Sequence, residues 1–152
     1  MRLVCAGVAN GISHTTSGEP TTSTVVLDRV TGQPIALFGV GGGVVRSIMS
    51  LFSGDLRRFP PCVVILSPSV MTFVDLPVYL RLMTLQNVRV TVMAPASVLD
   101  AVVQYIEDVL AEEDAAVGIA VQRMTQFVDL ETDVPVVLPT KLQTTTTLSS
   151  SG

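Results

Sequence analysis

Cys62-Val-Val-Ile-Leu-Ser-Pro-Ser-Val-Met-Thr-Phe-Val-Asp-Leu-Pro77 is the stretch that decides the fold. Its first five residues are apolar and mostly β-branched, which predicts a short buried strand. A loop is expected from Ser67 to Thr72, and a helix is expected to begin near Asp75, a favourable N-cap residue, with Pro77 in its first turn. A buried strand that leads through a loop into a helix is typical of α/β proteins. The loop contains no side chain that titrates near neutral pH.

The segments on either side continue the alternation of strand and helix. Upstream, the patterns predict a strand at 3–6, a hairpin at 22–38 and a helix at 44–52. Downstream, they predict a strand at 88–93, an amphipathic helix that begins after Ser97, a strand region at 118–130 and a short strand at 134–138. The predicted class is therefore α/β, a mixed sheet with an N-terminal hairpin. We expect one domain over 1–140 and a disordered low-complexity tail over 141–152.

The composition limits the possible function classes. Apolar residues make up 48% of the 152 residues and charged residues 14%, so a large core is expected, together with an apolar face that a partner could cover. A net charge of −4 gives no general attraction to nucleic acid, and no apolar run is long enough to span a membrane. Cys5 and Cys62 fall in predicted strands, which favours free core thiols and a reducing, intracellular compartment.

A glycine-rich turn follows the predicted hairpin, where Gly39, Gly41, Gly42 and Gly43 could present backbone amides to an anion. The dinucleotide fingerprint G-x-G-x-x-G is not met, because the third glycine position falls on Val44, and no Lys-Ser/Thr pair completes a P-loop. The alternative interpretation is a tight turn that lets a helix pack closely against the sheet. We expect no bound cofactor.

The remaining polar residues give weak indications of chemistry. His14 is the one histidine, and a solvated loop histidine is the simpler interpretation. Ser67, Ser69 and Thr72 would need a neighbouring base to act as nucleophiles, and the flanking sequence offers none. An acidic run is interpreted as the solvated face of a helix, because it lacks the spacing of a calcium loop; it comprises Asp100, Glu107, Asp108, Glu112, Glu113 and Asp114.

Taken together, residues 1–130 resemble the N-terminal half of the metallo-β-lactamase fold, in its RNase Z branch. Ile35-Ala-Leu-Phe-Gly-Val-Gly-Gly-Gly-Val-Val-Arg46 is similar to the family's strand and glycine turn, L-L-D-C-G-E-G-T, followed by a helix with an early Arg. Leu66 to Pro77 fits the frame of T-H-x-H-x-D-H-x-x-G-L-P without a gap, and Val90 to Pro95 is similar to the next strand, V-x-V-Y-x-P. The resemblance implies half of an αββα sandwich, in which two halves stack their sheets.

The chain departs from the family at its metal-ligand positions. The motif's two opening histidines, its aspartate and its last histidine fall on Ser67, Ser69, Met71 and Thr72, and the acidic residue of the glycine turn falls on Val40. Zinc prefers imidazole, thiolate or carboxylate ligands, and a two-zinc site of this type draws on about five histidines, whereas this chain has one. We therefore expect no catalytic or metal-binding residues.

The resemblance implies a non-catalytic pseudoenzyme that acts as a structural or protein-interaction module. It would form a homo-oligomer, or bind another protein, through an apolar sheet face. One alternative is an accessory half of a split RNA-processing hydrolase of the tRNA 3′-processing type, in which a partner holds the metals and contacts the nucleic acid. Another is a small α/β domain that binds an anion or nucleotide with the Gly39–Gly43 turn and the Ser67–Thr72 loop.

Overall fold

A computed structural model describes residues 2–9, 21–132 and 135–136 of the chain. His14 and the predicted tail at 141–152 lie outside the described residues. The strands and helices are β1 (Arg2–Ala9), β2 (Thr21–Leu27), β3 (Pro34–Phe38), α1 (Val44–Leu51), β4 (Cys62–Val64), α2 (Leu76–Leu85), β5 (Val90–Ala94), α3 (Ala96–Ala111), α4 (Ala115–Met124), β6 (Thr125–Asp129) and β7 (Pro135–Val136), with 3₁₀ turns at Leu56–Arg58 and Val70–Thr72. The predicted α/β class is confirmed.

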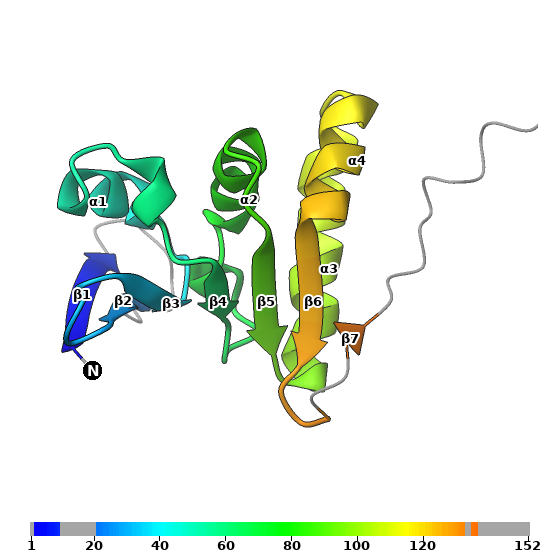
Figure 1. Cartoon of the computed structure of the whole chain (residues 1–152). Coiled ribbons are helices and arrows are strands. Elements are labelled where there is room, and N and C mark those ends of the chain that lie inside the picture. The colour runs from blue at the N-terminus through cyan, green and yellow to red at the C-terminus, as the bar shows by residue number, and fades with distance from the viewer. Residues whose placement is uncertain (1, 10–20, 133–134, 137–152) are drawn as a thin grey trace, which may run out of the picture.

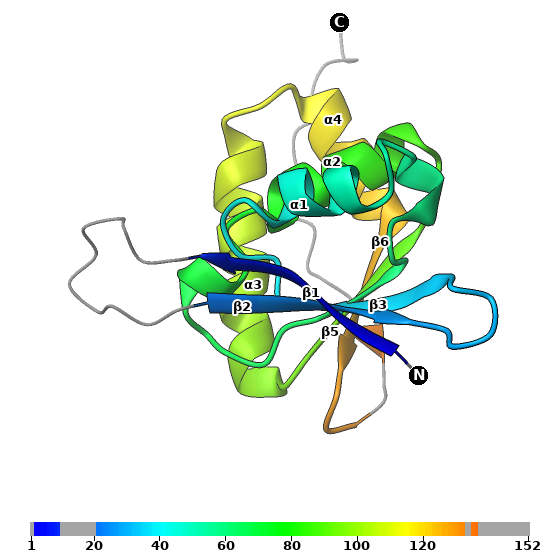
Figure 2. The ribbon, with the colours of Figure 1, turned by 90° about the vertical axis from the view of Figure 1, so that its left-hand side faces the viewer.

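The strands form one mixed sheet in sequence order, β1-β2-β3-β4-β5-β6-β7. β1, β2 and β3 pair antiparallel, so the hairpin predicted at 22–38 is present as β2 and β3. β3, β4, β5 and β6 are parallel, and β7 returns antiparallel to β6. Figure 1 shows this order as a left-to-right progression across a twisted sheet. Figure 2 looks along the sheet from the β1 side, where the twist separates the direction of β2 and β3 from that of β5 and β6.

The helices pack on one face of this sheet. Each parallel strand is added beside the previous one, and right-handed connections then place every helix on the same side. Their buried side chains join a single hydrophobic cluster with one alternating row of strand residues, formed by Val25, Leu37, Val63, Val92 and Phe127. In Figure 1, α3 passes behind β6. The core therefore lies between the sheet and one helical layer.

Two sequence-based predictions are wrong. Residues 118–124 belong to α4 and only 125–129 form a strand, although the whole of 118–130 was expected to be strand. The helix forms because Asp114 caps it, accepting a hydrogen bond from the Ala116 N–H at 2.8 Å, and because Val121 packs into the core. Ser97 is not an N-cap, since α3 already begins at Ala96 after Pro95.

Candidate functional site

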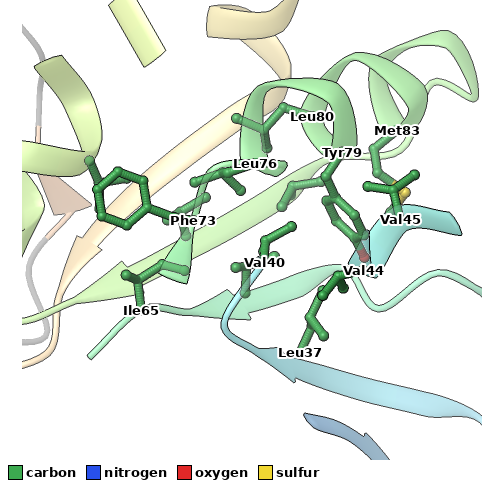
Figure 3. Packing of buried hydrophobic residues seen from close by; sticks show 14 of the residues in the cluster. Leu37, Val40, Val44, Val45, Ile65, Phe73, Leu76, Tyr79, Leu80 and Met83 are labelled. Carbon is green, nitrogen blue, oxygen red and sulfur yellow. The ribbon is translucent and has the colours of Figure 1, made fainter. Parts of the chain in front are cut away.

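The two loops singled out in the sequence meet beside the carboxyl ends of β3 and β4. The Val40 N–H donates to the carbonyl of Thr72 at 2.8 Å, and the Asp75 N–H donates to the carbonyl of Val40 at 3.0 Å. Val40 is fully buried and lies with Ile65, Phe73 and Leu76 in the core shown in Figure 3. The glycine turn therefore carries at Val40 an apolar side chain that packs inward.

The backbone amides of the glycine turn already have acceptors within the protein. The N–H of Gly41 donates to the buried hydroxyl of Ser23 at 3.3 Å. The N–H of Gly43 donates to a carboxylate oxygen of Asp75 at 2.8 Å. Gly43 is the N-cap of α1 and has a φ of 82°, a conformation that glycine adopts without strain. The carboxylate of Asp75 thus occupies the place beside the helix N-terminus that an external anion would take.

Asp75 has a different role from the one predicted. It does hold the N-cap position of α2, and Pro77 lies in the first turn as expected, but the Asp75 side chain makes no capping hydrogen bond to its own helix. Its carboxylate instead serves α1 through Gly43. No local pattern in the sequence points to this contact, because the two residues are 32 positions apart.

In the loop at Ser67–Thr72, the side chains of Ser67 and Thr72 make hydrogen bonds to the loop's own backbone. The Thr72 hydroxyl is within hydrogen-bond distance of the carbonyls of Ser69, at 2.7 Å, and Ser67, at 3.2 Å. The Ser67 hydroxyl accepts from the Ser69 N–H at 3.3 Å, and Met71 is half-buried in the 3₁₀ turn. The structure brings the four residues together, but their interactions are those of an ordinary loop. Within the described ranges, no group of three or more His, Cys, Asp or Glu side chains could hold a metal ion.

The second face of the sheet is apolar and carries no helix in the described part of the chain. One row of paired residues crosses it, formed by Thr24, Phe38, Val64, Met93 and Val128. The neighbouring row comprises Leu3, Val26 and Ala36 on β1, β2 and β3, and it continues through Cys62, Thr91 and Gln126 on β4, β5 and β6. We call these residues, together with Leu66, the open sheet face. It contains no charged side chain.

Exposure varies across the open sheet face. Leu3, Phe38 and Leu66 are 65%, 39% and 61% exposed. Val26, Val64 and Val128 are only 3%, 8% and 8% exposed, so much of the apolar surface at the centre of the face is already shielded in the single chain. The solvent-accessible part of the face therefore consists mainly of the large apolar side chains of Leu3, Phe38 and Leu66. Large exposed apolar side chains gathered on one face of a folded protein are typical of an interaction site.

Cys62 and Met93 form a sulfur pair on the same face, with the Sγ of Cys62 3.6 Å from the Sδ of Met93. Burial raises the pKa of the Cys62 thiol, which keeps it in the neutral form. A neutral thiol is a poor nucleophile, since the thiolate is the reactive species. Cys62 therefore contributes to the face as a small apolar side chain. Cys5 lies in β1, paired with Thr24, and its side chain is outside the described residues.

The acidic run begins in α3 and continues through the turn that leads to α4, and three of its residues line a groove between these two helices. The groove between α3 and α4 has a volume of about 300 Å³, and Glu107, Asp108 and Glu113 line it above Leu110 and Gly118. Glu113 is neutralised by Arg81, whose guanidinium lies 2.8 Å from its carboxylate. The interpretation of the run as the solvated face of a helix did not include this groove, because the groove depends on how two helices pack. The groove includes none of the four motif positions.

No protein-family model matches this sequence, and no curated protein matches it either. The helices of the described segments also include none with the length and apolar character needed to cross a membrane.

Proposed function

We propose that this protein is a non-catalytic relative of the RNase Z branch of the metallo-β-lactamase fold, and that it acts as a protein-interaction module. The observation that carries the proposal is the open sheet face, which is uncharged and has large exposed apolar side chains at Leu3, Phe38 and Leu66. A second layer placed on this face would remove that surface from water, at about 25 cal/mol per Å² of apolar area. The face therefore supplies a driving force for association without any catalytic group.

The motif loop supports the non-catalytic part of the proposal. Its hydroxyls, at Ser67 and Thr72, make hydrogen bonds within the loop, and Met71 offers only a weak thioether ligand. A hydrolase of the metallo-β-lactamase fold uses metal-bound hydroxide as its nucleophile, and the resemblance would require imidazole or carboxylate ligands at these positions. The residues present fit the hydrogen-bonding of a loop and do not fit zinc.

Two measurements test the proposal. The purified protein is incubated with zinc, desalted and analysed for metal by mass spectrometry; we expect much less than one zinc per chain, and stoichiometric zinc would overturn the non-catalytic assignment. An apolar fluorescent dye is then added to dilute protein. We expect a strong rise in fluorescence that the substitution Leu66→Glu reduces, while Val78→Glu, at a 47% exposed position of α2, leaves it unchanged. A dye-silent protein would contradict an exposed apolar face.

The accessory half of a split RNA-processing hydrolase remains a second candidate, because the same face would receive a metal-bearing partner. The two candidates differ in one outcome. RNA cleavage that appears only when a histidine-rich partner is added to this chain would favour the split enzyme. The anion-binding alternative has less support, since the Gly43 N–H is already bonded to Asp75.

A further inference from the structure

We infer that the occupant of the open sheet face is a second copy of this chain, packed sheet against sheet to give a four-layer helix–sheet–sheet–helix dimer. This inference rests on the proposed interaction function and names its partner. The residues that define the open sheet face are all apolar or an uncharged Thr, Cys or Gln.

An uncharged face selects an uncharged partner. A charged partner surface would bury ions without counter-ions, which is unfavourable. A second copy meets this requirement at every position, because the same rows of side chains lie on both surfaces. Phe38 and Met93 stand beside Val64 in the central row, so large and small side chains alternate across the strands. Two such rows related by a two-fold axis can interdigitate, as the inner faces of stacked sheets do.

The size of the face is sufficient for a reversible dimer. From β1 to β6, strands spaced by about 4.8 Å span about 29 Å, and two or three alternate residues along each strand span about 13–20 Å. The projected area is then about 400–600 Å² per copy, so a pair buries about 800–1,200 Å², a range that includes the roughly 1,000 Å² at which specific interfaces begin. An interface near this lower bound predicts a dimer that dissociates on dilution.

The geometry of stacked sheets fixes the arrangement. Sheets that pack face to face lie about 10 Å apart with strand directions within about 30° of each other. Because α1, α2, α3 and α4 all belong to the core on the opposite side, they do not obstruct a second sheet. Leu66, at 61% exposed in the single chain, would become buried at the contact.

The test is the mass of the full chain in solution across a wide concentration range, by light scattering after size exclusion and by sedimentation velocity. We expect a monomer at low concentration and a dimer at high concentration, with less dye bound per chain as the dimer forms. Leu66→Glu should weaken dimerisation at least about 100-fold, because the dimer would bury two unpaired carboxylates. Val78→Glu, on the helical layer, should leave the dimer intact, and circular dichroism checks that both variants fold.

The outcomes separate this inference from the proposed function. A chain that stays monomeric at every concentration yet binds dye would overturn the dimer and retain an interaction face for a different protein. A dye-silent monomer would overturn both. A dimer that Leu66→Glu does not weaken would place the contact elsewhere and overturn the inference. Small-angle scattering gives a further check, since face-to-face packing is compact whereas pairing at the edge of β1 would give an elongated particle.

Discussion

The carboxylate of Asp75 accepts a hydrogen bond from the backbone N–H of Gly43 at 2.8 Å, and it thereby joins the loop before α2 to the beginning of α1. The backbone of the same two segments is joined twice more, through Val40 to Thr72 and through Asp75 to Val40. The end of the parallel sheet that carries chemistry in many α/β proteins is here closed by the protein's own hydrogen bonds. The hydrogen bond between Gly43 and Asp75 therefore makes the stability of α1 depend on a residue in the loop before α2.

Replacing Asp75 should destabilise α1 in particular. Asp75→Ala removes a charge-assisted hydrogen bond and a negative charge near a helix N-terminus, and we expect the free energy of unfolding to fall by about 1–2 kcal/mol. Asp75→Asn keeps an acceptor and should cost less. Urea denaturation gives the free energies, and hydrogen exchange of α1 amides locates the effect. Asp100→Ala, at an exposed position of α3, is the control and should change stability by less than about 0.5 kcal/mol. Equal stability of the Asp75 and Asp100 variants would contradict the argument.

The neighbouring glycines give a matched pair of substitutions. Gly43 has a φ of +82°, which an alanine adopts only with strain of about 1–2 kcal/mol. Gly42 has no left-handed φ, and a Cβ there would meet the Cγ1 of Val74 at 3.7 Å, an ordinary contact. We therefore expect Gly43→Ala to lower the thermal midpoint by several degrees and Gly42→Ala to leave it nearly unchanged. Similar losses in both variants would show that space limits the turn more than backbone conformation does.

Much of this fold could be predicted from the sequence, because the apolar spacing that indicates a helix or a strand lies within a few neighbouring residues. The apolar spacing of Val44, Val45 and Ile48 places α1 correctly, and the stripe of Val98, Val102 and Ile106 does the same for α3. The turn residues between β2 and β3 fix the hairpin. These signals are strong where a helix buries one face and exposes the other.

Residues 118–124 could not be assigned in this way. Ile119 and Val121 are β-branched and sit beside Gly118, a composition that favours strand or turn by propensity. The segment is helical because Val121 is buried against the core and Asp114 caps the first turn. Tertiary packing outweighs propensity here.

The candidate site was only partly predictable. The sequence placed the glycine turn and the Ser67–Thr72 loop at strand ends, but it could not reveal that Val40 bonds to Thr72 or that Asp75 bonds to Gly43, because both contacts join distant positions. Locating the open sheet face required knowledge of the strand order as well. Strands added in sequence order leave all helices on one side, and no periodicity within a single strand carries that information.

Tyr79 should make the protein sensitive to alkaline pH. Its side chain is fully buried, its hydroxyl donates to the carbonyl of Pro60, and its ring stacks on Phe59 at 5.7 Å. Burial raises the pKa of Tyr79 above its ordinary value of about 10. The folded state therefore holds the proton more tightly than the unfolded state, so the stabilisation is complete below pH 10 and is lost as the pH rises above it.

Tyr79→Phe tests this pH dependence. At neutral pH the variant should lose about 1 kcal/mol with the hydrogen bond to Pro60, and above pH 10 its stability should decline less steeply than that of the parent. Burial also raises the pKa of Cys62, which adds a loss of the same sign from about pH 8.5. Both proteins are therefore compared with Cys62→Ala in place. Parallel stability curves from pH 7 to 11 would show that Tyr79 does not cause the alkaline loss.

Asp114 should be the residue that most directly holds α4 in helical form. Its carboxylate accepts from the Ala116 N–H at 2.8 Å, and α4 has little amphipathic character of its own, with Gly118 and Val121 as its buried residues. Asp114→Ala should cost about 1 kcal/mol and increase hydrogen exchange in the first turn of α4, whereas Asp114→Asn should retain most of the cap. Glu112→Ala, two residues earlier and exposed, is the control and should change neither quantity. If Asp114→Ala left exchange in α4 unchanged, burial of Val121 alone would account for the helix, and the strand-like composition of this segment would be overridden by the core without help from its cap.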